Sequence, residues 1–291
     1  MVERDELGLE QLQATPIDET EKLRELSEDV NPGLELRKLL QRMYPFDPGT
    51  ESSFISRVDS AFKAEGSLSK LLHESTMNYL VRRLINTAEF LRRKYESDDF
   101  PPGKFVEELR QYLRNETRVR SSDVEKLLAI LQSCVAFKKK NRKSIRKEQF
   151  IKRAFPNRVD LLCYICGKSL TLEEVQIEHE WPKTLGGSNE DFNLKISCCS
   201  CNAEKQSYID GSDFHYEQIC LSTNESDESF VKEFKKIYKI ALSAKHGYKC
   251  ALCGQSAEFA GRLNFVRRNL SDSWHFLNID TICEACRNLG M

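Results

Sequence analysis

The residues with the clearest chemical signal in this 291-residue chain are cysteines, which occur in pairs separated by two residues. Such a pair presents two thiolates from one tight turn, and two pairs together complete the tetrahedral shell of a structural zinc ion. Eight of the eleven cysteines fall into four pairs, so the sequence predicts two zinc ions. The first quartet is Cys163, Cys166, Cys198 and Cys201, and the second is Cys250, Cys253, Cys283 and Cys286.

Polar side chains that a structural zinc ion does not require lie within or just after the first quartet. A neutral imidazole can accept a proton from water near neutral pH. Carboxylate and amide oxygens are ligands that Mg²⁺ and Mn²⁺ prefer. Together with a cation, these groups supply what the hydrolysis of a phosphodiester by an activated water needs. The side chains are Glu178, His179, Asn193, Asn202 and Lys205.

The order of these residues resembles that of the HNH endonucleases, the zinc-stapled branch of the ββα-metal or His-Me finger nucleases. The resemblance covers about residues 156–210 and includes Glu-His-x-Trp-Pro, Gly-Gly and Cys-x-x-Cys-Asn-x-x-Lys. It implies that His179 is the general base and that Asn193 holds the loop that orients it. It also implies that Glu178 and Asn202 hold a catalytic ion, Mg²⁺ or Mn²⁺. Lys205, one helical turn beyond Asn202, is expected to reach a phosphate as a point charge.

The placement of Glu178 beside His179 constrains the local backbone. Neighbouring residues of a regular strand point their side chains to opposite faces of the sheet. The two side chains can therefore share one site only if the strand bends at its end. Trp181-Pro182 follows directly, and we expect this dipeptide to begin a loop that brings them together.

The second quartet is spaced like a degenerate copy of the first. Asn278 lies five residues before Cys283, as Asn193 lies five before Cys198, and a glycine follows the first pair in both. Phe265 and Val266 are expected at the Glu-His positions, so the copy retains the zinc staple without the acid and the base. We expect its arginines to form a DNA-binding surface, with Arg287 in the place of Asn202. The other arginines are Arg262, Arg267 and Arg268.

The charge of the chain is unevenly distributed. The net charge is only −1, which argues against a protein that binds nucleic acid through bulk positive charge. Residues 1–50 carry 12 acids against 6 bases, whereas residues 137–155 carry 9 bases against one acid. Phosphate neutralisation by such a stripe supplies affinity for DNA of any sequence. The residues expected to contact DNA are Lys138, Lys139, Lys140, Arg142, Lys143, Arg146 and Lys147.

The elements that must position these residues define an α+β protein. Apolar residues recur at helical spacing before residue 137, with Asn31-Pro32 opening one helix. The zinc modules are short hairpins with helices. No apolar run reaches the ~18 residues of a membrane span and the start lacks a signal peptide, so we expect a cytoplasmic protein. The predicted parts are an all-α helical domain with an unknown protein partner (1–136), a basic connecting helix (137–155), the ββα-metal HNH zinc module (156–210), a helical connector (211–245) and a second small, treble-clef-like zinc module (246–291).

The function predicted from these features is metal-dependent hydrolysis of phosphodiester bonds in double-stranded DNA. One module cuts one strand at a time, so the product is a nick, or a double-strand break after a second event. The resemblance implies a setting in restriction or anti-phage (antiviral) defence. The alternative is a non-catalytic, zinc-stapled adaptor that binds DNA. RNA stays open as a substrate, because the sequence contains no motif that decides between the two nucleic acids.

Overall fold

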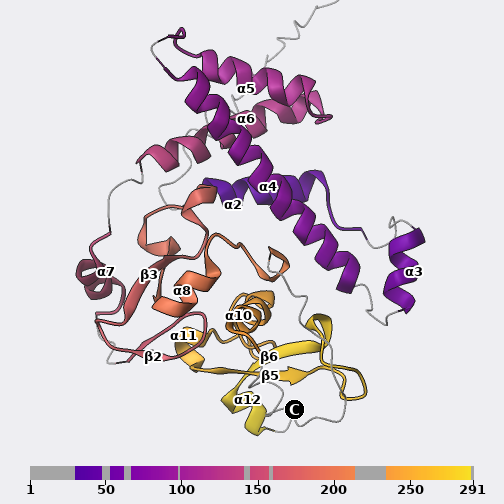
Figure 1. Ribbon diagram of the computed structural model, residues 1–291, viewed down its shortest axis with the longest axis vertical. Helices are drawn as coiled ribbons and strands as arrows, with labels where there is room; N and C mark the ends of the chain where they lie inside the picture. The colour runs from indigo at the N-terminus through magenta and orange to yellow at the C-terminus, as the bar shows by residue number, and fades with distance from the viewer. Residues whose placement is uncertain are drawn as a thin grey trace, which may run out of the picture.

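The computed structural model describes residues 30–47, 53–61, 67–97, 99–140, 145–156, 160–213 and 234–289. A layer of helices lies above two small zinc modules, with α10 between those modules (Figure 1). All three β-sheets are two-stranded antiparallel hairpins within the described part of the chain. The architecture is therefore α+β, as the sequence predicts.

The helical region is built from amphipathic helices around one apolar core, except that α3 packs on α4 outside this core. α2 begins at the expected Asn31-Pro32, with proline in the first turn, where its missing N–H costs nothing. Leu36 of α2, Val81 and Ile85 of α4 and Leu127 of α6 are fully or almost fully buried in this core. The helices are α2 (Pro32–Met43), α3 (Ser53–Ala61), α4 (Ser67–Tyr95), α5 (Lys104–Asn115) and α6 (Ser121–Lys140).

This helical core also contains two residues from the first zinc module. Trp181 and Leu185 are buried among the side chains of the helices, although they lie more than 40 residues beyond α6. The Trp181 indole donates to the Leu185 carbonyl at 2.8 Å, which closes the short loop between them. The loop that follows His179 is thus covered by the helical region.

The first zinc module is a pair of hairpins followed by a helix. Its central hairpin pairs β3 with β4 over five residues, from Val175 opposite Cys198 to His179 opposite Leu194. α8 starts directly after β4 and packs back on both strands. The elements are α7 (Lys147–Ala154), β1 (Leu161–Leu162), β2 (Ser169–Leu170), β3 (Val175–His179), η1 (Lys183–Leu185), η2 (Asp191–Asn193), β4 (Leu194–Cys198), α8 (Cys199–Lys205) and η3 (Gly211–Asp213).

The second zinc module repeats the hairpin and the final helix. Tyr238 of α10 and Trp274 of the module are buried in the same apolar core as β3, β4 and α8. The second module therefore contributes side chains to the core of the first, and it also has a small apolar cluster of its own around the second quartet. Its elements, with the preceding helix, are α10 (Lys236–Lys245), α11 (Ala257–Ala260), β5 (Leu263–Arg267), η4 (Phe276–Asn278), β6 (Ile279–Cys283) and α12 (Glu284–Asn288).

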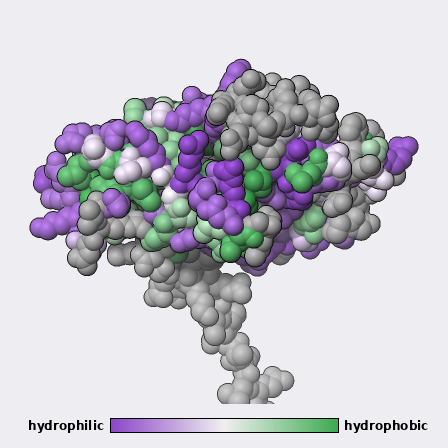
Figure 2. Space-filling model, turned by 90° about the horizontal axis from the view of Figure 1, so that it is seen from below, coloured by the Kyte–Doolittle hydropathy of each residue, from purple (hydrophilic) through white to green (hydrophobic). Residues whose placement is uncertain are grey.

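The visible surface is mixed in polarity. Seen from below, hydrophilic residues cover much of the described surface, with smaller apolar areas between them (Figure 2). Among the described helices, none combines the length and the apolar character needed to cross a membrane.

Candidate active site and zinc centres

The cysteines of the first quartet converge on one point. Their four Sγ atoms lie within 4.8 Å of one another, and three of the four residues are buried. Zinc bound to four thiolates at about 2.3 Å separates the sulfurs by roughly 3.8 Å, so this donor set fits a structural zinc ion. Cys163 and Cys166 come from the turn after β1, whereas Cys198 ends β4 and Cys201 lies in α8.

The second quartet converges in the same way. Its four Sγ atoms also lie within 4.8 Å of one another. Cys253 and Cys283 bring their sulfurs to 3.7 Å, which is close to the separation of two thiolates on one zinc ion. Both quartets predicted from the spacing can therefore hold zinc.

His179 ends β3 and faces a cleft of about 460 Å³. Its Nε2 lies 2.8 Å from Oδ1 of Asn189. An amide oxygen only accepts hydrogen bonds, so Nε2 carries the hydrogen and Nδ1 keeps the lone pair. Burial lowers the pKa of His179 below the ordinary value for histidine, the hydrogen bond to Asn189 opposes this shift, and the charge of Lys183 adds to it. The imidazole is thus held neutral and able to accept a proton.

Asn193 is buried and uses its whole amide to tie the loop after His179 together. Its Oδ1 accepts from the backbone N–H of Trp181 at 2.8 Å. Its Nδ2 donates to the carbonyls of Trp181 at 3.1 Å and of Ser188 at 2.8 Å. This loop carries Asn189, the partner of His179, so the contacts of Asn193 suit the loop-holding role that the resemblance implies.

Asn31, at the start of α2, completes this network from the helical region. Its Nδ2 donates to Oδ1 of Asn193 at 3.0 Å, and its Oδ1 accepts from the backbone N–H of Ser188 at 2.8 Å. Asn31 is the N-cap residue of α2, but its side chain makes no cap hydrogen bond. The sequence indicated only a helix start here, because a contact across 162 residues leaves no local signal.

A second set of contacts joins α4 to the segment after α8. Arg82 donates to Oδ2 of Asp213 at 2.6 Å and to the carbonyl of Ser207 at 2.8 Å. Asn78, fully buried, donates to Asp210 and Ser212, each at 2.9 Å. The helical region therefore contacts the first zinc module at two places in the sequence, the loop before β4 and the segment after α8.

Lys205 corrects one expectation, because it does not reach out toward a phosphate. Its side chain is fully buried, and its ammonium pairs with Oε1 of Glu178 at 2.8 Å. It also donates to the backbone carbonyl of His179 at 3.0 Å. Burial raises the pKa of Glu178, and the charge of Lys205 opposes that shift. Lys205 thus stabilises the end of β3 from the protein interior.

The expected bend that would bring Glu178 and His179 together is also absent. β3 pairs regularly with β4 through His179, so the side chains of these neighbours alternate across the sheet. Glu178 turns inward to Lys205, whereas His179 lines the cleft. As placed, Glu178 does not fit as a ligand of an ion beside His179, because its carboxylate is buried in an ion pair.

Asn202 lies on α8, three residues before Lys205. Residues three apart share a face of a helix, and Lys205 uses that face to contact the end of β3. Asn202 is partly exposed. This places Asn202 on the side of α8 that is turned toward Glu178, and Asn202 is not among the residues that line the cleft of His179.

The second module reproduces the asparagine clamp without the base. Asn278 accepts from the N–H of Asn269 at 2.9 Å and donates to the carbonyls of Asn269 at 3.0 Å and Ser273 at 2.8 Å. These partners correspond to Trp181 and Ser188 around Asn193. The strand register pairs Leu263 with Cys283, which puts Val266 and Arg267 at the Glu-His positions. The alignment with Phe265 and Val266 expected from the sequence was therefore wrong by one residue.

The residues expected to contact DNA are only partly described. Lys147 lines the cleft beside His179 and donates to the carbonyl of Leu172 at 2.8 Å. Arg146, just before α7, and Arg287, on α12, are exposed. Arg142 and Lys143 lie outside the described residues, as do the side chains of three lysines at the end of α6: Lys138, Lys139 and Lys140.

Comparison with known proteins gives one match. Residues 163–213 match the family model described as HNH endonuclease. No curated protein and no solved structure gives a significant match to the chain. The chain therefore contains an HNH endonuclease domain with a four-cysteine cluster inside it, and a second such cluster follows at 250–286. A domain of this family implies a nucleic-acid substrate.

Proposed function

We propose that this protein is an endonuclease that hydrolyses phosphodiester bonds of double-stranded DNA. The observation that carries the proposal is the position of His179, which lines an open cleft in the matched domain with Nε2 held by Asn189. Nδ1 then accepts a proton from water as the water attacks phosphorus. Lys183 and Lys147 line the same cleft and supply positive charge near the phosphate.

The catalytic ion belongs to the proposal as well. When bound, Mg²⁺ or Mn²⁺ would offset the charge that develops on the phosphate oxygens. Asn202 offers a hard oxygen donor, whereas Glu178 is engaged by Lys205. The family resemblance assigns Asn202 as the ligand from this chain, although Asn202 is not among the residues that line the cleft of His179. The zinc ions of the two quartets are structural in this scheme.

The test is the conversion of supercoiled plasmid to nicked and linear forms, with Mg²⁺ or Mn²⁺ present. The unaltered chain should cut, and His179→Ala should lose activity by at least about 100-fold, the typical contribution of a general base. Retention of both zinc ions by His179→Ala would show that its fold is intact. Cutting by His179→Ala at the normal rate would contradict the proposal. A labelled duplex RNA tested in parallel decides between the two nucleic acids.

A second candidate is a non-catalytic, zinc-stapled adaptor that binds DNA. The second module favours it, because there the zinc staple and the asparagine clamp persist around Val266 and Arg267. An adaptor would bind plasmid without nicking it under any divalent ion. The same assay therefore separates the two candidates.

The biological setting is proposed from the family resemblance alone. An HNH module with an extra helical domain resembles restriction and anti-phage nucleases, and a cytoplasmic location would suit that role. Protection of cells against phage by the unaltered chain, but not by His179→Ala, would support this setting.

A further inference from the structure

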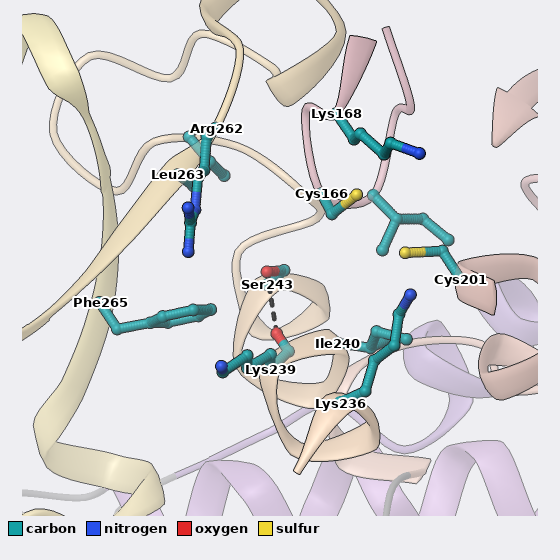
Figure 3. Close-up of a pocket in the computed structure, with 11 residues that line it drawn as sticks. Cys166, Lys168, Cys201, Lys236, Lys239, Ile240, Ser243, Arg262, Leu263 and Phe265 are labelled. Atoms are coloured by element: carbon teal, nitrogen blue, oxygen red, sulfur yellow. Dashed lines mark hydrogen bonds between the residues drawn. The ribbon is translucent and has the colours of Figure 1, made fainter. Parts of the chain in front are cut away.

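A basic pocket lies between the two zinc modules and shares no lining residue with the cleft of His179. Its volume is about 330 Å³. One wall comes from the first zinc turn and α8, another from α10, and the third from the start of β5 (Figure 3). Ile165, Ile240, Leu263 and Phe265 give it an apolar lining. The pocket is thus formed only when both modules and α10 come together.

The lysine and arginine side chains that line this pocket lie beside the zinc ligands Cys166 and Cys201, which also line it. The cations are Lys168, Lys236, Lys239 and Arg262, and no carboxylate is among the lining residues. Lys168 pairs with Glu174 at 2.8 Å, and Lys236 donates to the hydroxyl of Ser200. Within the described chain, Lys239 and Arg262 have no acidic side chain in ion-pair distance. Burial lowers the pKa of Lys239, and the nearby charge of Arg262 adds to the shift.

The two modules hold the walls of the pocket in a fixed arrangement. Gly167 of the first zinc turn packs on the backbone of Gly261, so a Cβ at Gly167 would come within 2.2 Å of the Gly261 carbonyl. Lys168 and Arg262 are the next residues on either side of this contact. The backbone contact therefore holds Lys168 and Arg262 close together, where the thiolates of Cys166 and Cys201 offset part of the positive charge when zinc is bound.

We propose that this pocket binds a backbone phosphate of the nucleic-acid substrate, away from the phosphate that is cut. The inference rests on the proposed function, which supplies the polyanion. The planar guanidinium of Arg262 can donate two parallel hydrogen bonds to a phosphate, and Lys239 adds a point charge. Arg268 is less suited to this role, because it is paired with Asp280 at 3.0 Å. The second module thereby contributes to substrate binding, although it has no catalytic base of its own.

The experiment measures DNA binding by His179→Ala without divalent ions, so that no cutting interferes. Lys239→Gln with Arg262→Gln should weaken binding about tenfold, the size of one charge-assisted hydrogen bond. It should also lower the slope of log affinity against log salt by about one unit for the lost phosphate contact. The charge-conserving pair Lys239→Arg and Arg262→Lys should retain the slope. The matched control is Lys126→Gln with Arg118→Gln, which removes one exposed lysine and one exposed arginine from the helical region.

Two zinc ions per chain in every variant would establish that the fold is intact. An unchanged slope and affinity, relative to the control pair, would overturn the pocket proposal even if the unaltered chain cuts DNA. Conversely, a chain that binds through the pocket but never cuts contradicts the nuclease and leaves the pocket standing. Binding of a free nucleoside monophosphate at the pocket, with no effect on DNA binding, would assign the site to small phosphates and overturn the proposal.

Discussion

Two neighbouring side chains influence the tautomer and the protonation state of His179. Asn189 fixes the hydrogen on Nε2, and this contact was not foreseen from the sequence, because asparagine in a loop carries no pattern of its own. Lys183 directly follows Trp181-Pro182 and adds positive charge to the cleft. Burial of the ring is the largest cause of its lowered pKa, since burial disfavours the charged form.

The pH dependence of cutting should reflect this environment. Because the pKa of His179 is lowered, the neutral base is already present at neutral pH and is lost only on acidification. Activity should therefore be level near pH 7 and fall below about pH 6.5, the ordinary histidine value. Lys183→Gln removes a charge that lowers the pKa, so it should move this acid limb to higher pH. An acid limb whose midpoint lies above pH 7 in the unaltered chain would contradict the assignment of His179 as the base.

The pair of Glu178 and Lys205 should behave as a structural ion pair. Glu178→Gln leaves the fully buried ammonium of Lys205 without its counter-charge, so it should destabilise the fold by about 3 kcal/mol. Glu178→Gln combined with Lys205→Met should recover most of that loss, because no buried charge is then unpaired. Thermal unfolding with zinc present measures both. A Glu178→Gln chain of normal stability that fails to use Mg²⁺ would instead return Glu178 to the role of metal ligand.

At the scale of elements, the spacing of residues predicted which functional side chains lie on each turn and strand. It did not predict which distant segments pack over them. The cysteine pairs, His179 and the clamp of Asn193 lie within one hairpin and its loop, so their positions follow from the order of the chain. The helix start at Asn31 was also local. Its contact with Asn193 and the burial of Trp181 depend on how distant segments pack, and the sequence contains no periodicity for such contacts. Lys205 was misassigned for the same reason.

The contact between α2 and the loop after His179 predicts an effect of Asn31 on catalysis. Asn31→Ala leaves the backbone N–H of Ser188 without its side-chain acceptor, which should cost about 2 kcal/mol of stability. It should also lower the rate at saturating DNA by about tenfold, since the loop that carries Asn189 would shift. Asn31→Asp can accept from Ser188 but cannot donate to Asn193, so it tests the two bonds separately.

The control for this prediction is Asn115→Ala, at the exposed end of α5. It should change neither stability nor rate. If Asn31→Ala loses stability but cuts at the normal rate once folded, α2 supports the loop without positioning His179. The substrate affinity should be unchanged in either case, because Asn31 is buried and does not line the cleft.

At the scale of the whole molecule, the expected parts are joined more closely than their sequence boundaries imply. Trp181 and Leu185 belong to the core of the helices, and Tyr238 and Trp274 belong to the core of the first zinc module. The helical region, for which we expected an unknown protein partner, therefore packs one of its faces against the first zinc module of the same chain. The three parts should unfold together when their cores are shared in this way.

This arrangement predicts that the nuclease module cannot act without the helices. A chain that begins at residue 141 exposes Trp181 and Leu185 and loses the bond from Asn31. Two buried apolar side chains stabilise by about 4 kcal/mol together, which is a large share of the 5–15 kcal/mol typical of a domain. We expect the shortened chain to bind zinc, to melt at a clearly lower temperature and to cut plasmid poorly. Adding residues 1–140 as a separate chain should restore part of the activity. Trp181→Ala in the full chain should lower the melting temperature in the same direction, and normal cutting by the shortened chain would show instead that the module is autonomous.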